Sequence, residues 1–121
     1  MRFFIPTIGT KIKLLDDWSF TLYNEYRNIT LKTAFGIVGH PNRWQNNPIT
    51  MATYNAILIA GTVMSVDRIY IRKNAKEFDS ITFKILSSSD ERLQKKQGSH
   101  GYGRFWVKLD DANNINADIV T

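Results

Sequence analysis

The 121-residue sequence contains no cysteine and only two histidines. Without cysteine the chain can form no disulfide, thiolate nucleophile or thiolate metal ligand, and a reducing cytoplasm is its natural compartment. His40 and His100 lack the paired spacing of metal ligands, so each is interpreted as a surface or structural residue. We therefore expect neither a metal ion nor another cofactor.

Long apolar segments are missing as well. No stretch approaches the roughly 20 apolar residues of a membrane-spanning helix. The apolar run from Phe3 to Ile5 is far shorter than the hydrophobic region of a secretion signal. The triplet Asn28-Ile29-Thr30 is therefore interpreted as the beginning of a strand rather than as a glycosylation site.

The sequence also lacks the common motifs of catalysis. No serine lies in a nucleophile elbow, and the glycines near Gly103 lack both the strand-to-helix context and the lysine of a phosphate-binding loop. The adjacent carboxylates Asp16-Asp17 and Asp110-Asp111 are more typical of turns and caps than of an acid–base pair. We expect no enzymatic activity. A catalytic site that depends on a single arginine is the one alternative that the sequence leaves open.

The length and the net charge of the chain indicate one basic domain. A chain of this length builds one core, so residues 1–121 are assigned to a single domain. The formal net charge of +5 favours polyanionic partners, but an excess of this size is also found in proteins that are merely kept in solution.

Alternation of apolar and polar residues predicts a mainly β fold. Strands are predicted at Arg2–Ile5, Lys11–Leu14, Trp18–Tyr23 and Ile29–Phe35, in a central hairpin between Gly61 and Leu86, and at Gly103–Leu109. The strands at Lys11 and Trp18 are expected to pair as a hairpin.

Two segments are candidates for short helices. Residues Thr50–Leu58 fit either a helix or the approach to the next strand. Ser88 and Glu91 fit a capping box that begins a short helix or a loop. We predict a small antiparallel barrel or strongly bent sheet with one or two short helices, because closure removes exposed strand edges.

Two predicted strands each place a cation, an aromatic ring and a cation on one face. The six residues are Arg68, Tyr70 and Arg72 on the first strand and Arg104, Trp106 and Lys108 on the second. The arginine fork matches phosphate oxygens, and a ring beside it offers a base a stacking surface of ~1–3 kcal/mol. We interpret these six residues as a ligand site, with the cations binding phosphates and the rings binding bases.

The same pattern has two other interpretations. The side chains form the ordinary solvated face of a sheet, with Tyr70 and Trp106 as a stabilising cross-strand pair. Alternatively, the aromatic face is an interface between copies of the chain.

The segments Asp67–Arg72 and Gly103–Leu109 resemble parts of small bacteriophage proteins of similar size. In its size, β-richness and lack of catalytic residues, the chain also resembles phage anti-defence proteins that sequester nucleotide signals, such as the anti-Thoeris sponges. No residue role is carried over from that family.

The resemblance implies a non-enzymatic sponge for a nucleotide or cyclic nucleotide, acting in the cytoplasm of a bacterial host. A small domain has limited surface with which to enclose a ligand, so we expect a homo-oligomer with the site between protomers. The alternatives are a protein that binds single-stranded DNA or RNA, and a protein-interaction inhibitor that uses the same face.

Overall fold

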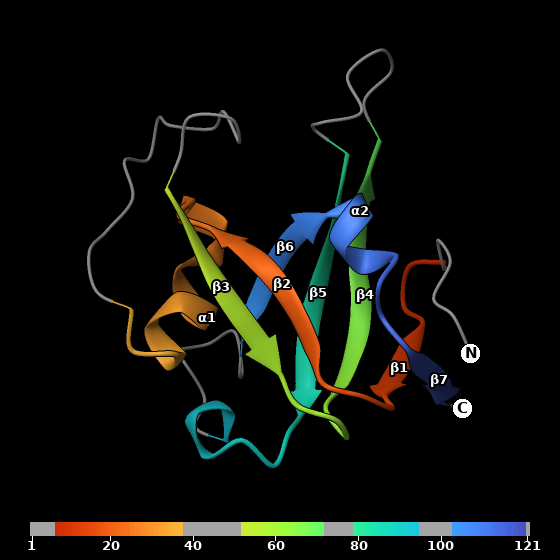
Figure 1. Ribbon diagram of the computed structural model, residues 1–121. Coiled ribbons are helices and arrows are strands. Elements are labelled where there is room, and N and C mark those ends of the chain that lie inside the picture. Colours follow the sequence, from red (N-terminus) through yellow and green to blue (C-terminus); the bar gives the residue numbers. More distant parts are fainter. Residues whose placement is uncertain (1–6, 38–51, 72–78, 95–102, 121) are drawn as a thin grey trace.

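The computed structural model describes residues 7–37, 52–71, 79–94 and 103–120, and it shows a mainly β fold (Figure 1). The larger antiparallel sheet contains β1 (Lys11–Leu14), β4 (Val63–Tyr70), β5 (Ser80–Ser87), β6 (Arg104–Lys108) and β7 (Ala117–Val120), in the order β6-β5-β4-β1-β7. The smaller sheet contains β2 (Trp18–Tyr23) and β3 (Thr53–Leu58). The short helices are α1 (Ile29–Ala34) and α2 (Leu109–Ala112), with 3-10 turns η1 (Tyr26–Asn28) and η3 (Glu91–Leu93). None of the helices in these ranges is long and apolar enough to cross a membrane.

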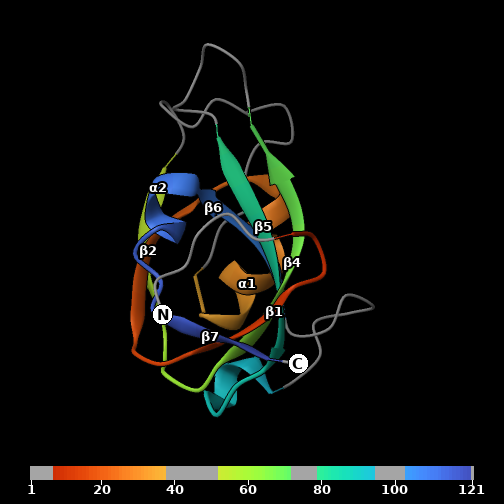
Figure 2. The same cartoon turned by 90° about the vertical axis from the view of Figure 1, so that its right-hand side faces the viewer.

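The two sheets form two layers with the core between them. Figure 2 shows the layers from the side, with β2 and β3 to the left and β4 and β5 to the right. The apolar face of β2 directs Trp18 and Phe20 at the inner face of the larger sheet. The ring centroids of Phe20 and Phe105 lie 5.3 Å apart, and those of Trp18 and Phe83 lie 5.8 Å apart. This aromatic cluster joins the layers.

A β-bulge in β4 decides which of its side chains leave the core. The register passes from Val66 opposite Phe83 directly to Arg68 opposite Thr82, which leaves Asp67 as an extra residue. A bulge shifts the alternation of a strand by one position. Arg68 therefore points outward, although Val66, two residues before it, is buried in the core.

The predicted hairpin between the strands at Lys11 and Trp18 is wrong. In the structure β1 pairs with β4 and β7, whereas β2 pairs with β3. The intervening turn carries the chain from one layer to the other, where the Oδ1 of Asp17 accepts a hydrogen bond of 2.8 Å from the Ala60 amide. The two segments thus face each other across the core instead of pairing side by side.

The predicted strand at Ile29–Phe35 is also wrong, because this segment forms α1. Its β-branched residues favour a strand locally. Leu31 and Phe35, however, lie four residues apart on one side of the helix, and both pack on the core. Burial of that side outweighs the weak local preference.

The two uncertain segments are now assigned. Residues Thr53–Leu58 form strand β3, which pairs with β2, so the helix alternative is wrong and the segment is itself a strand rather than the approach to one. The predicted capping box at Ser88 is wrong. The N-cap of η3 is Asp90, which accepts a hydrogen bond from the Arg92 amide, whereas Ser88 accepts one from the Asp90 amide.

Two further fold predictions stay open. The predicted strand at Arg2–Ile5 lies outside the described residues. The mainly β class is confirmed, but the arrangement in two sheets does not establish a barrel or a strongly bent sheet, which remains a prediction.

Candidate functional site

Five of the six predicted site residues lie on one side of the larger sheet, the side opposite its buried aromatic cluster. We call this side the outer face. These residues are Arg68, Tyr70, Arg104, Trp106 and Lys108. The sixth, Arg72, lies outside the described residues.

Strand register aligns three cations across the outer face. Lys11 lies opposite Ser65, Ser65 opposite Lys84, and Lys84 opposite Arg104. Residues directly opposite one another in antiparallel strands share a face. Lys11, Lys84 and Arg104, which we call the cation row, therefore span three strand spacings, or about 14 Å. Sequence reasoning assigned only Arg104 to the site. The partners of β1 could not be read from the alternation around Lys11, and Lys84 was omitted because its strand lacks the pattern of a cation, a ring and a cation.

Two further rows lie beside the cation row. They consist of Arg68, Thr82 and Trp106, and of Tyr70, Ser80 and Lys108. Strand β5 thus separates the two aromatic residues, and they also lie in different rows. The suggested cross-strand pair between Tyr70 and Trp106 is therefore wrong.

Trp106 is a buried structural residue. Its side chain is 4% exposed, and its ring stacks on Tyr23 with centroids 5.1 Å apart. Its indole Nε1 donates a 2.5 Å hydrogen bond to Glu25, and the Arg27 guanidinium lies 5.6 Å from the ring centroid. The predicted role of Trp106 as a stacking platform for a base is therefore corrected, because its ring is already packed against protein groups.

Tyr70 keeps the exposure expected of a ligand-binding ring, since 52% of the residue is accessible. Arg104 is also largely accessible, and its Nε lies 3.3 Å from the carboxylate of the bulge residue Asp67. The Lys108 ammonium lies 5.5 Å from the centroid of the Tyr23 ring. Exposed ion pairs and cation–π contacts of this kind are weak enough to exchange for a ligand.

The outer face carries more cations than carboxylates. Its basic residues are Lys11, Lys13, Arg68, Lys84, Arg104 and Lys108. Asp67 pairs with Arg104, and Asp118 lies opposite Lys13. Several positive charges are thus left to attract an anion.

The β6 edge is closed by a side chain from η1. The Oδ1 of Asn28 accepts a 2.8 Å hydrogen bond from the Trp106 amide, and its Nδ2 donates to the Tyr23 carbonyl at 3.0 Å. Asn28 thereby imitates a paired strand at this edge and fixes η1 and α1 beside β6. A local sequence pattern does not reveal this contact, because 78 positions separate the two residues.

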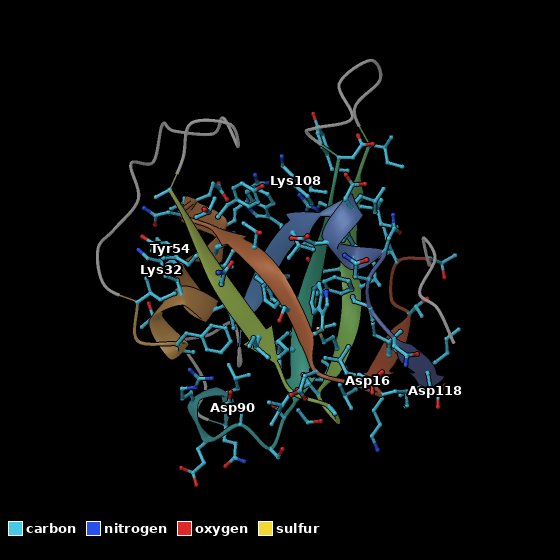
Figure 3. The ribbon with its side chains drawn as sticks, in the orientation of Figure 1. Asp16, Lys32, Tyr54, Asp90, Lys108 and Asp118 are labelled. Carbon is cyan, nitrogen blue, oxygen red and sulfur yellow. The ribbon has the colours of Figure 1, made fainter. Side chains whose placement is uncertain are left out.

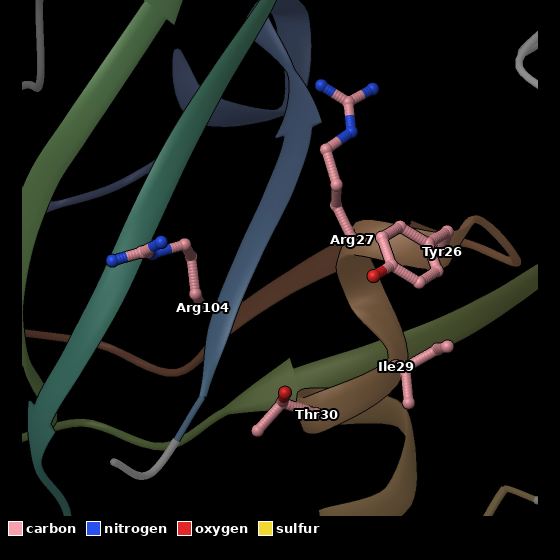
Figure 4. A pocket seen from close by; sticks show the side chains of 5 residues that line it. All are labelled: Tyr26, Arg27, Ile29, Thr30 and Arg104. Carbon is pink, nitrogen blue, oxygen red and sulfur yellow. The ribbon is translucent and has the colours of Figure 1, made fainter. Parts of the chain in front are cut away.

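A pocket of about 300 Å³ lies where η1 and α1 meet β6 (Figure 4). Its lining residues are Tyr26, Arg27, Ile29, Thr30 and Arg104. Arg104 thus belongs to both the pocket and the cation row. Figure 4 shows its guanidinium pointing over β5, away from α1, so its aliphatic stem is the part nearest the pocket.

A second charged cluster lies away from the outer face. In Figure 3, Asp90 and Lys108 are at opposite ends of the molecule. The side-chain hydrogen bond from Arg92 lowers the pKa of Asp90, and the same bond raises the pKa of Arg92. The Arg92 guanidinium also lies 4.6 Å from the centroid of the Phe35 ring. Arg92 thus contacts Asp90 and Phe35 and shares a pocket with Asn55 and Ile57 of β3, and it offers a control cation that is not part of the cation row.

Each of the two adjacent carboxylate pairs in the sequence contributes to structural contacts, through Asp16 and Asp17 in the first pair and Asp111 in the second. The Asp111 carboxylate accepts a 2.9 Å hydrogen bond from the Thr21 amide and ties α2 to β2. The Asp16 carboxylate accepts a 2.7 Å hydrogen bond from the Asn116 side chain. Within the described ranges, no three acidic or histidine side chains gather as they would around a metal ion, and His40 and His100 lie outside those ranges.

No protein-family model matches the chain, and no curated protein or solved structure is significantly similar to it.

Proposed function

We propose that the protein is a non-enzymatic binding protein that holds a phosphate-bearing ligand on its outer face. The observation that supports this most strongly is the alignment of Lys11, Lys84 and Arg104 by strand register. Three cations from strands distant in sequence form one stripe, and strands hold side chains more rigidly than loops do. Phosphate oxygens are the natural partners of such a stripe.

The ligand that we propose is a nucleotide or cyclic-nucleotide signal that the protein sequesters, as phage anti-defence sponges do. Arg104 and Arg68 supply the guanidinium groups, and Tyr70 supplies the exposed ring. Because the outer face is open on one side, a second protomer would complete the walls of the site, so we propose a homo-oligomer. A strongly bent sheet fits the same proposal, since bending would bring the ends of the cation row toward one ligand.

Single-stranded DNA or RNA is the second candidate. The length of the cation row favours it, because about 14 Å of basic surface exceeds what a single phosphate group requires.

Equilibrium binding distinguishes the two ligand classes. Mononucleotides, cyclic dinucleotides and a mixed oligonucleotide of roughly 20 residues are titrated over a range of salt concentrations. A sponge should bind a nucleotide, ignore the oligonucleotide and show a shallow salt dependence. For a polymer, log affinity should fall with log salt by about 0.7–0.9 per phosphate contacted. Binding of neither class would reject the proposed function.

Light scattering tests the oligomer. We expect a dimer or larger assembly at micromolar protein concentration with and without the bound nucleotide. A monomer that binds the nucleotide with full affinity would contradict this part of the proposal.

A further inference from the structure

We propose that the pocket between α1 and β6 seats the base of the ligand, while the phosphates lie on the cation row. This inference rests on the proposed function and adds a binding site for the uncharged base of the ligand. Sequence reasoning assigned base binding to Tyr70 and Trp106, and Trp106 is buried.

The pocket offers a planar ring the surfaces it requires. Ile29, the stem of Arg104 and the ring of Tyr26 supply apolar and aromatic contact (Figure 4). The hydroxyl groups of Thr30 and Tyr26 supply hydrogen-bonding atoms for the polar edge of a base. A few polar groups in a mainly apolar pocket are typical of small-molecule sites.

The volume indicates the size of the group that the pocket walls can surround. About 300 Å³ is the lower end of the range of ligand pockets, roughly 300–1,000 Å³. A single ring-bearing group matches such a space better than a whole dinucleotide does. The remainder of a larger ligand would have to continue over the outer face.

Charge is placed at the edges of the pocket rather than inside it. Arg104 lines the pocket, and Lys84 lies directly opposite it in the cation row. Arg27 also lines the pocket; its Nε is 3.0 Å from Glu25, and its guanidinium extends away from α1 in Figure 4. A nucleotide with its base in the pocket thus has two arginines beside it.

The walls of the pocket are held in place by the β6 edge. Asn28 fixes η1 to the backbone of β6 at Trp106, and α1 follows directly after it. Leu31 anchors α1 in the core, where it is fully buried. A ligand therefore meets a largely preformed pocket, which lowers the entropic cost of binding.

The test compares nucleoside 5′-diphosphates with inorganic pyrophosphate, which has the same two phosphates and no base. We expect the wild-type protein to prefer at least one nucleotide by about tenfold or more, the range of stacking of one base on a ring. Thr30→Trp fills the pocket and should abolish that preference while pyrophosphate affinity stays unchanged. Tyr26→Ala, at an exposed position in η1, should also reduce the preference, and its unfolding free energy is measured beside that of the wild type as a control for folding.

Lys84→Ala separates this inference from the proposed function. It should weaken nucleotide and pyrophosphate equally, because it removes a phosphate contact. If Lys84→Ala weakens both while Thr30→Trp and Tyr26→Ala leave the nucleotide preference intact, the pocket assignment is wrong and the phosphate-binding face stands. If Lys84→Ala changes neither affinity, the proposed function itself fails.

Oligonucleotides with and without a 5′-phosphate identify the source of the base. Selective binding of the 5′-phosphorylated strand, again lost in Thr30→Trp, would place a terminal nucleotide in the pocket. Binding of mononucleotides alone would assign the pocket to a free nucleotide. Equal binding of both strands by wild-type and Thr30→Trp proteins would contradict the inference.

Discussion

Strands β4 and β6 each carry a cation and, two positions later, an aromatic ring, yet the ring is exposed on β4 and buried on β6. Tyr70 on β4 is 52% exposed, whereas Trp106 on β6 is 4% exposed. Strand β4 lies inside the sheet, where β1 pairs with its first half, and Tyr70 in its second half pairs with Ser80 of β5. Strand β6 is at the edge, and η1 folds against it to pair the Trp106 amide through Asn28. A sequence pattern thus predicts which face a side chain takes, and the neighbours of the strand decide whether it stays exposed.

This difference assigns separate tasks to the two rings. Trp106, with Tyr23 and Glu25, anchors the edge of the sheet. Tyr70 remains available to a ligand.

The largest expected effect comes from truncating the two rings in turn. Trp106→Ala should destabilise the fold by about 3–5 kcal/mol, since it leaves a cavity at a buried position. Tyr70→Ala should change the free energy of unfolding by no more than about 0.5 kcal/mol, as is usual for exposed positions. Urea denaturation measures both. Equal losses would show that the two rings are not distinguished by their neighbours.

A smaller effect is expected at the edge contact itself. Asn28→Ala leaves the Trp106 amide and the Tyr23 carbonyl without this partner, at a cost of about 1–3 kcal/mol. Hydrogen exchange at the Trp106 amide should become faster than at amides paired within β5. Asn28→Asp keeps an acceptor for the Trp106 amide, but it also brings a carboxylate oxygen against the Tyr23 carbonyl at a buried position, so it serves as a control for protection of the Trp106 amide and not for stability. If exchange at Trp106 were unchanged in Asn28→Ala, the edge would be protected by some other contact.

The comparison also shows what the sequence could predict. Alternation was sufficient for the mainly β class, for the central hairpin and for the outward direction of Arg104. The outward direction of Arg68 was predicted from its alternation with Ile69, but the bulge at Asp67, which shifts the alternation after the buried Val66, was not predicted. Alternation could not show that Lys11 joins the same face, because that depends on pairing between Lys11 and Ser65, 54 positions away. It also could not show the burial of Trp106, which depends on η1 rather than on β6.

The strand predicted at Ile29–Phe35 was wrong for a related reason. Its β-branched residues favour a strand when each is considered alone. The spacing of Leu31 and Phe35 is the helical signal, and it becomes decisive only once a core is present to bury both.

The smallest effect is expected at the Asp90–Arg92 pair, which lies outside both strands under comparison. Asp90→Asn should cost about 1 kcal/mol or less at neutral pH, because Arg92 is largely exposed and solvent screens the pair. The pKa of Asp90 is lowered in the folded protein. Its contribution is therefore present above the ordinary carboxyl pKa and is lost as the pH falls through the folded-state pKa.

Unfolding free energies of both proteins across the acid range check this sign. The difference between wild type and Asp90→Asn should shrink toward zero as the pH falls. A difference that grows in acid would contradict the assigned pKa direction.

The most direct test of the central claim is the affinity of the cation row for a phosphate-bearing ligand. Pyrophosphate and the nucleotide panel are titrated against Lys84→Ala/Arg104→Ala and against Arg92→Ala, which removes a cation far from the outer face. We predict that the double variant loses about a hundredfold or more in affinity, since each of the two charge-assisted hydrogen bonds is worth about 1.5–3 kcal/mol, while Arg92→Ala binds like the wild type. Equal affinities in the wild type, the double variant and Arg92→Ala would show that the outer face is ordinary surface.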